Sequence, residues 1–518
     1  MLFLRPALLL LAFCFFLPAA FGAQHHLFFR IVLGKQFSKP VSGRLLLFVK
    51  PGFGASRIDP NPFHPKAVYV AAQKIHDLAP GSAVEIDTDA VAFPSGFSQL
   101  APGDYQAQAL VDVNHSYTYN GRGPGDVISP VVRLPHFSPA NSPEPTITLD
   151  ATVPEPGPLV LPGSPTEQHE EAAHIHKETF VSPALSHFWG RPITMRAYVL
   201  TPPGYDKSSR KYPVVYFTQG FEGNMRYLHK MAAGIYRRMA DSRIPPMLWI
   251  LLDESCPEGT DEFADSANDG PWGKALTTEF MPYLESRYRV DRRAAARFLN
   301  GHSSGGWATL WLQVNYPKIF GGTWSTSPDP SDFHDFSGID LYAPHASMYH
   351  KPDGSPYPLA RVKGKVVVTF KQYSRLEAVL GPYGGQMASF EWVFSPKGPS
   401  GAPMQLFDRV TGAIHPKVAH AWEKYDISRI LASHWTTLKP YLNGKIHVIV
   451  GTADTFYLDG SAHKLKAVLD SLHASAEIEF LPGRTHGNLY RIGNDPMGLL
   501  DQIAAEMYHS WQAHRMSR

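Results

Sequence analysis

Cysteine is nearly absent from this chain. The 518 residues include only Cys14 and Cys256, and Cys14 lies in an apolar N-terminal run that we expect to be removed. The mature chain then has a single cysteine and cannot form an internal disulfide. We read Cys256 as a small buried or loop residue, and we expect the protein to depend on its hydrophobic cores for stability.

Charge is also scarce. Charged residues make up 18% of the chain and the formal net charge is +2, with no block of lysine and arginine. This composition gives no electrostatic basis for binding nucleic acid. No apolar run beyond the N-terminus is long enough to cross a bilayer, so we expect no transmembrane segment in the mature chain.

The first 23 residues have the pattern of a secretory signal peptide. Arg5 precedes an apolar run over 7–17, which is followed by the small residues and proline of 18–23. A cationic start, a short apolar stretch and a small-residue end are typical of a cleaved leader. We therefore predict a signal peptide over 1–23 and an exported protein, either periplasmic or secreted.

Residues 24–150 alternate between apolar and polar positions, and proline, glycine, asparagine and aspartate separate the runs. We expect short strands over 45–49, 83–87, 105–111 and 146–149, with no convincing helix between them. The pattern predicts an all-β sandwich of immunoglobulin-like type. Residues 151–178, which begin with a proline-rich stretch, are predicted to be a linker.

The pattern changes in residues 179–518, where expected strands and helices alternate. The strands are expected at 195–200, 214–217, 247–252, 295–299, 322–325, 446–450 and 478–481, and the helices at 225–242, 274–288, 304–317, 463–473 and 499–516. This alternation predicts an α/β domain with a mostly parallel sheet covered on both faces. The segment 329–444 is far longer than an ordinary connection, so we expect an inserted cap.

The most informative motif is Gly301-His302-Ser303-Ser304-Gly305, which follows one of the expected strands. A serine on such a sharp turn between strand and helix exposes its hydroxyl above the sheet, and the flanking glycines allow strand and helix to approach closely. Ser303 is therefore the candidate nucleophile.

A nucleophilic serine needs a base and an orienting acid, and both candidates follow expected strands. Asp454 comes just after 446–450, and Asp459 is an alternative acid five residues further on. We favour Asp454. His486 lies on a loop next to Gly487, after the last expected strand, and is the candidate base.

Two backbone donors are expected to stabilise the oxyanion of the reaction. One is the N–H of Ser304, immediately after the nucleophile. The other comes from the loop that follows the strand 214–217, which we assign to the N–H of Phe221.

These features resemble the putative-esterase branch of the α/β-hydrolases. That group includes esterase D, S-formylglutathione hydrolases, enterochelin esterases, feruloyl esterases and the antigen 85 mycolyltransferases. The resemblance spans about 180–515 and rests on the segments 200–205, 212–216, 280–285, 288–290, 301–306, 316–322 and 485–487. It implies an α/β-hydrolase fold with a triad of Ser303, Asp454 and His486. This chain departs from the group in having Gln219-Gly220 where His-Gly is common, and in its long insertion before the acid.

The expected activity is hydrolysis of a carboxylic ester, in a small-molecule or carbohydrate-linked substrate, through an acyl-enzyme. Two alternatives stay open: acyl transfer by the same triad, and a non-catalytic protein that binds carbohydrate or a cell surface. No cofactor and no metal are expected. His169 and His174 flank a Glu-Glu pair, but they are five residues apart, whereas a zinc helix needs four.

Overall fold

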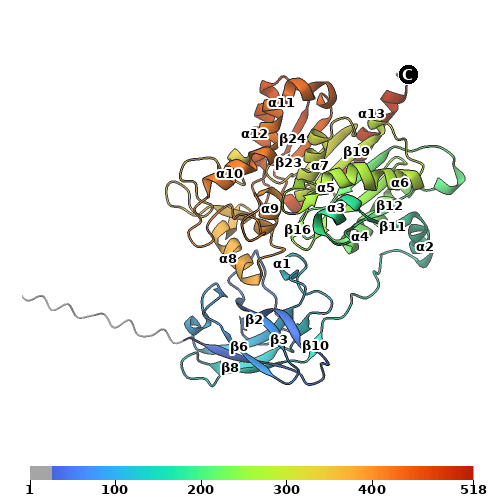
Figure 1. The fold of residues 1–518 in the computed structure, drawn as a ribbon. Coiled ribbons are helices and arrows are strands. Elements are labelled where there is room, and N and C mark those ends of the chain that lie inside the picture. Colours follow the sequence, from blue (N-terminus) through green and yellow to red (C-terminus); the bar gives the residue numbers. More distant parts are fainter. Residues whose placement is uncertain (1–25, 517–518) are drawn as a thin grey trace, which may run out of the picture.

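The structure is a computed structural model that describes residues 26–516. The predicted signal peptide over 1–23 lies outside the described residues. Figure 1 shows a smaller domain, coloured blue to cyan, beneath a larger one that contains the remaining elements. No helix within 26–516 combines the length and the apolar character needed to cross a membrane.

The smaller domain consists of two sheets. One has the order β4-β1-β9; the other has the order β10-β7-β6-β2-β3-β5, with β8 also paired to β6. Their bounds are β1 28–33, β2 41–51, β3 69–78, β4 83–87, β5 92–93, β6 103–112, β7 127–128, β8 132–137, β9 146–149 and β10 151–152, with one short helix, α1, at 117–120. Phe29 and Ile31 of β1 share a core with Leu45 and Leu47 of β2. All four predicted strands are present, and the immunoglobulin-like type stays a prediction.

The second sheet of this domain is covered on its other face by the larger domain. Leu46 and Phe48 of β2 belong to a core cluster that includes Val379 and Leu380 of helix α8 (370–380). Figure 1 shows α8 pointing down from the larger domain onto the smaller one. The two domains are therefore joined by a shared apolar core.

The larger domain is built on an eight-stranded sheet of order β11-β12-β14-β13-β19-β20-β23-β24. The strands are β11 175–181, β12 194–200, β13 214–218, β14 248–253, β19 297–302, β20 322–326, β23 446–451 and β24 477–481. β12 is antiparallel to β11 and to β14, and the remaining neighbours are parallel. All seven predicted strands are found here, and the carboxyl ends of the parallel strands meet at one edge.

Helices cover both faces of this sheet. Helices α4 and α13 pack against Trp249 and Phe298 on one face, whereas α7, α11 and α12 pack against Val448 on the other. The helices are α3 183–189, α4 225–240, α5 272–275, α6 281–287, α7 304–315, α11 427–442, α12 459–471 and α13 498–516, with a π-helical turn at 276–280 between α5 and α6. The short strands β15 to β18 lie within 255–271, between β14 and α5.

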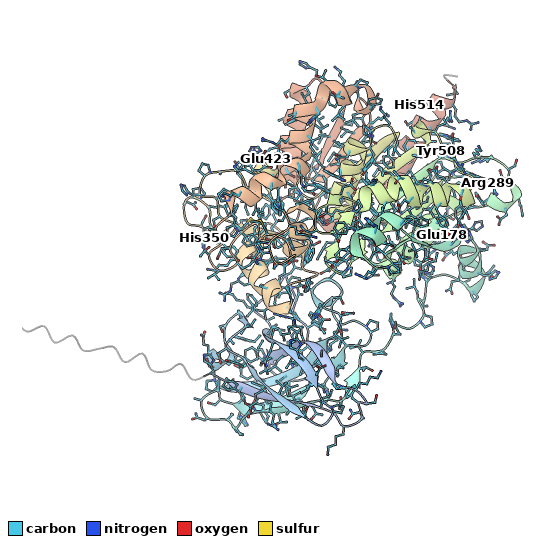
Figure 2. All side chains as sticks on the ribbon, viewed as in Figure 1. Glu178, Arg289, His350, Glu423, Tyr508 and His514 are labelled. Atoms are coloured by element: carbon cyan, nitrogen blue, oxygen red, sulfur yellow. The ribbon has the colours of Figure 1, made fainter. Side chains whose placement is uncertain are left out.

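The predicted linker over 151–178 is too long, because its second half belongs to the larger domain. Helix α2 (165–174) begins at Ser164, whose side chain forms a capping box with Glu167. Strand β11 then pairs with β12, and Glu178, labelled in Figure 2, is buried in it. Its carboxylate accepts hydrogen bonds from the hydroxyls of Tyr283 and Tyr288. The Ser-x-x-Glu spacing of Ser164 and Glu167 is typical of the start of a helix, but the charged residues that follow it suggested a solvated linker.

The predicted insertion over 329–444 has its own structure. It contains the hairpin β21 (358–362) and β22 (365–369) and the helices α8, α9 (386–394) and α10 (416–422). Its last helix, α11, packs against α7 and α12 and so belongs to the layer that covers the sheet. The additional part of the insertion is therefore 329–426.

Candidate active site

Ser303 lies on a sharp turn between β19 and α7 and has a backbone φ of 62°. This left-handed conformation is rare for a residue with a side chain, and it costs free energy that the surroundings must offset. Gly301 and Gly305 are required because the backbone around the turn leaves no room for a side chain. A Cβ on Gly301 would lie 2.2 Å from the carbonyl oxygen of Gly305, and one on Gly305 would lie 2.4 Å from that of Gln219. The turn therefore has the geometry that the motif predicts.

His486 and Asp454 form a hydrogen-bonded pair beside this turn. The Nδ1 atom of His486 lies 2.9 Å from Oδ2 of Asp454, whose side chain is fully buried. Burial alone would raise the pKa of Asp454. The charge and hydrogen bond of His486 and the N–H of Phe456 outweigh it, so the pKa is lowered. The carboxylate therefore stays ionised and can hold the imidazole in one orientation.

The alternative acid, Asp459, is turned away from His486. It begins helix α12, and its Oδ1 atom accepts a hydrogen bond from Arg361 at 3.4 Å. Arg361 also donates to the backbone oxygen of Asp454 at 2.9 Å. Of the two candidate acids, only Asp454 lies at the imidazole.

Asp329 is a second carboxylate at the turn, and it was not among the predicted site residues. Its Oδ2 atom accepts a hydrogen bond from the Ser304 hydroxyl at 2.7 Å, and its Oδ1 atom lies 3.5 Å from Oγ of Ser303. Among the described residues, no hydrogen bond joins Ser303 to His486. Burial raises the pKa of Asp329 to about 6. The Ser303 hydroxyl thus faces Asp329 and not His486 in this structure.

A neutral histidine lies against the candidate base. The ring of His302 is 4.4 Å from that of His486 between centroids, and its Nδ1 atom is 3.2 Å from Oγ1 of Thr326. Burial, and then the neighbouring His486, lower the pKa of His302 to about 3. His302 therefore supports the His486 ring without adding a charge at neutral pH.

The loop after β13 passes directly beside Ser303, the candidate nucleophile. A Cβ on Gly220 would lie 3.1 Å from Cβ of Ser303, so the loop has no room for a larger residue. Gln219 donates to Asp253 at 3.2 Å, which directs its side chain away from Ser303. On the other side, Tyr119 of the smaller domain donates to the oxygen of Gly223 at 2.5 Å and contacts the Phe221 ring edge-on at 5.1 Å.

Ser303 and His486 line a common cavity of about 370 Å³. That volume is typical of a site for a small-molecule ligand. The cavity wall is mostly apolar, and three parts of the chain contribute to it. The larger domain supplies Phe221, the insertion supplies Leu359, Val368, Tyr373 and Gln386, and the smaller domain supplies Pro62 and Phe63.

Residues 189–485 match the family described as Putative esterase, which is more than half of the chain. The chain belongs to this family. This match confirms the predicted resemblance to the putative-esterase branch. A curated relative, the uncharacterized protein YbbA of Bacillus subtilis (strain 168), is 26% identical over 137 residues, which are 24% of this chain. The chain spans about half (53%) of that relative's length.

Several solved structures are similar to the esterase. A ferulic acid esterase aligns with 65% of this chain and 98% of its own, at 13% identity and a TM-score of 0.41. An S-formylglutathione hydrolase from Agrobacterium tumefaciens aligns with 65% and 96%, at 13% identity and a TM-score of 0.37. Assignment to the family rests on the sequence match.

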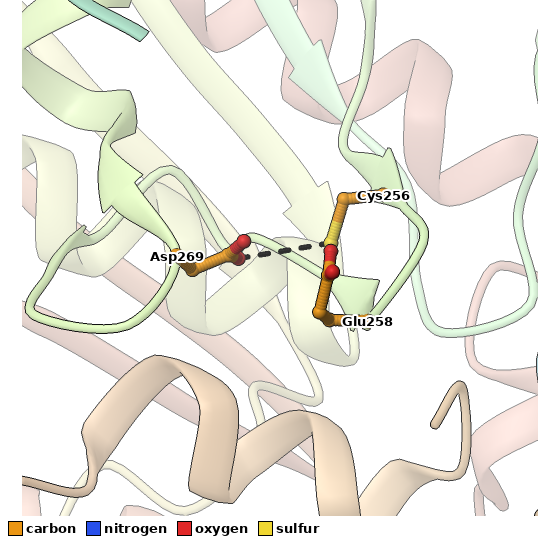
Figure 3. A group of neighbouring side chains, drawn as sticks. All are labelled: Cys256, Glu258 and Asp269. Atoms are coloured by element: carbon orange, nitrogen blue, oxygen red, sulfur yellow. Dashed lines mark hydrogen bonds between the residues drawn. The ribbon is translucent and has the colours of Figure 1, made fainter. Parts of the chain in front are cut away.

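Two groups of side chains in the described part of the esterase have the donor atoms of a metal site. Cys256, Glu258 and Asp269 converge in Figure 3, with Sγ of Cys256 3.6 Å from Oδ2 of Asp269. The second group is Asp332, His334 and Asp426, whose carboxylates already accept backbone N–H bonds. Neither group lines the cavity that holds Ser303. Burial raises the pKa of the Cys256 thiol well above its usual value, which makes it a poor nucleophile.

Proposed function

We propose that this chain is an exported serine esterase that hydrolyses a carboxylic ester through an acyl-enzyme on Ser303, His486 and Asp454. The observation that carries this proposal is the Asp454–His486 pair, at 2.9 Å, in the same cavity as a serine held on a strained turn. Nucleophile, base and orienting acid each follow a strand of the sheet and meet at its carboxyl edge.

The reaction begins when the Ser303 hydroxyl turns from Asp329 toward His486. His486 takes its proton on Nε2 while Nδ1–H remains bonded to Asp454, and Oγ attacks the ester carbonyl. The developing oxyanion is stabilised by the N–H of Ser304, which is at the first position of α7 and has no partner within the helix. The N–H of Phe221 is the second donor.

Collapse of this intermediate expels the alcohol, which leaves as an alkoxide that His486 protonates. A water molecule, activated by the same imidazole, then attacks the acyl-enzyme and releases the acid. The apolar wall of the cavity limits access of bulk water during these steps. Asp329 holds the resting serine and the Ser304 side chain that follows it.

We also propose where the protein is located and what its smaller domain and its insertion are. A signal peptide over 1–23 would direct the chain to the periplasm or the exterior. The smaller domain would be a β-sandwich of immunoglobulin-like type, and the insertion would act as a cap. The four residues that the insertion places in the cavity wall support the cap.

The direct test is labelling by a fluorophosphonate probe, which reacts with activated serines. The wild-type protein should be labelled and should hydrolyse a small aryl ester. Ser303→Ala should abolish labelling and lower turnover by about 10⁴–10⁶-fold. Ser471→Ala, on an exposed position of α12, is the matched control and should behave as wild type. Labelling that persists in Ser303→Ala would refute the nucleophile, and a product formed with an added alcohol in place of water would indicate acyl transfer.

A further inference from the structure

The smaller domain forms part of the wall on the His486 side of the site. The ring of Phe63 lies 6.1 Å from that of Phe456, which in turn contacts His486 edge-on at 4.9 Å. Phe63 belongs to the loop between β2 and β3, almost 400 positions before Phe456 in the chain. The side of the cavity where His486 would protonate a leaving alcohol is therefore built by both domains.

A second cavity, of about 170 Å³, adjoins the first at the boundary between the domains. The two cavities share Pro62, Glu222 and Tyr373 in their walls. The smaller domain adds residues such as Asp59 and Thr118, and α8 adds Leu376, Glu377 and Leu380. The two cavities are therefore neighbours that meet at Pro62, Glu222 and Tyr373.

The junction of the two cavities offers a free hydrogen-bond acceptor. Glu222 forms no hydrogen bond or ion pair among the described residues, and it lies on the loop that holds Phe221. It is accessible to solvent within the cavity, yet the protein around it desolvates the carboxyl and raises its pKa. Tyr373, which lines both cavities, lies close enough to feel its charge. A carboxylate and a phenol at one point suit a ligand that donates hydroxyl groups.

Apart from Glu222, the charged groups of the second cavity have partners or a raised pKa. Asp59 is paired with Arg57 and with Arg122, so its charge is neutralised. Arg57 also lines the cavity and is largely exposed, which adds a positive charge at its mouth. Glu377 also lines the cavity; burial raises its pKa to about 7, and its Oε1 atom already accepts the N–H of Met387 at 2.8 Å. The prolines and leucines of the wall suit the C–H surface of a neutral, compact group.

We propose that this interdomain cavity binds the alcohol part of the ester, and that this alcohol is neutral and rich in hydroxyl groups, as a sugar is. The proposal rests on the proposed function, because it assigns the leaving group of that reaction. Glu222 accepts hydrogen bonds from the hydroxyls, and Phe63 forms the apolar wall of the first cavity beside Phe456 and His486, where the alcohol leaves the ester. The smaller domain thereby determines which alcohols the enzyme accepts.

The test compares three esters with the same acyl group and different alcohols: methyl cinnamate, 6-O-cinnamoyl glucose and cinnamoylcholine. The wild-type enzyme should have the highest kcat/KM for the glucose ester. The quantity to follow is the ratio of kcat/KM for the glucose ester to that for the methyl ester. Phe63→Ala and Glu222→Gln should each lower it by about 10-fold, because each removes contacts made only by the larger alcohol.

Phe53→Ala is the matched control, because Phe53 belongs to the smaller domain but lies on its surface, outside both cavities. It should leave the ratio within about twofold of wild type. The thermal midpoint of each variant shows whether it is folded. Glu222→Gln changes an exposed side chain of nearly the same shape, so it keeps the test valid even if Phe63→Ala is unstable.

Ratios that stay at the wild-type value in both variants, with hydrolysis of all esters intact, would overturn the interdomain site and leave the proposed function standing. A preference for cinnamoylcholine would overturn the neutral, hydroxyl-rich alcohol. Failure of the wild-type enzyme to hydrolyse any ester, together with no labelling of Ser303, would overturn the proposed function and this inference with it.

Discussion

The sheets of the two domains are buried in different ways. Strands β13, β14 and β20 of the larger sheet are buried at every position, because helices cover both of its faces. Strands β1 and β9 of the smaller domain alternate between buried and exposed positions, as strands with one solvent face do. The centre of β2, over 45–49, is buried at every position, since α8 and loops of the smaller domain cover its second face. The smaller domain therefore contains one sheet that is complete only in the presence of the other domain.

The largest expected effect is at Asp454, the candidate acid of the larger domain. Asp454→Ala should lower kcat by about 10³–10⁴-fold, because His486 loses the carboxylate that orients it. Asp459→Ala should have a much smaller effect, since its partner is Arg361. Steady-state kinetics on a small aryl ester measure both variants, and a crippled Asp459→Ala would show that the acid has been misassigned.

Removal of the smaller domain tests whether the larger domain is stable without the apolar core that the two share. A fragment that starts at residue 160 retains α2 and β11 but exposes the apolar face of α8. We expect it to aggregate or to melt at least about 10 °C below the full chain. The same fragment with Leu376, Val379 and Leu380 changed to Ser is the matched control and should be more soluble. A fragment as stable as the full chain would show that the shared core contributes little.

Within the shared core, Phe48→Ala should destabilise the protein by about 3–5 kcal/mol, the usual cost of deleting a buried aromatic side chain. Phe53→Ala, in the same domain but 41% exposed, should cost no more than about 0.5 kcal/mol. Denaturant unfolding measures both. Equal costs would mean that the face of β2 toward α8 is not tightly packed.

The interface should also make stability depend on pH. Burial raises the pKa of Glu377 on α8 to about 7, from an ordinary value of 4.5. The folded form then binds a proton more tightly than the unfolded form, so this group's contribution to stability is lost as pH rises from about 4.5 through 7. Glu377→Gln should reduce the fall in melting temperature between pH 5 and pH 8. A variant whose melting temperature falls as steeply as that of wild type would contradict this assignment.

The smallest expected effect is at Arg44. Its guanidinium donates to the backbone oxygen of Val379 at 2.7 and 3.0 Å and so joins the two domains. Arg44→Ala should cost about 1–2 kcal/mol, since the bonds lie at the edge of the interface. Arg30→Ala, an exposed position on β1, is the control for loss of one positive charge. Unfolding by urea that does not distinguish the two variants would remove Arg44 from the interface.

Much of the catalytic edge could be predicted from the sequence, because each of its parts has a local signal. The Gly-x-Ser-x-Gly turn, the aspartate after β23 and the histidine after β24 are all adjacent to strongly apolar strands. Spacing along the chain was enough to order them. The choice of Asp454 over Asp459 agrees with where the structure places the two side chains.

The contacts between distant segments could not be predicted in this way. Asp329 meets Ser304 because β20 ends beside β19, and its position after a strand was the only hint. Phe63 reaches Phe456 through a tertiary contact that has no pattern in the sequence. A usable signal did exist for the shared core. The unbroken apolar run over 45–49 is typical of a strand buried on both faces, which a sandwich with one solvent face does not require.

The shared core also constrains the order in which the molecule can fold. Arg44 and Val379 are 335 residues apart, so the smaller domain is synthesised long before its covering helix exists. At about 5–20 residues per second, Leu46 and Phe48 remain exposed for roughly 17–67 s. During that interval the outer face of β2 is covered only by residues of its own domain, such as Ile58 and Tyr117, and the apolar surface that α8 later covers is open to other chains. Docking of α8 is therefore a late step of folding, and the rate of synthesis and the availability of chaperones should affect the yield of native protein.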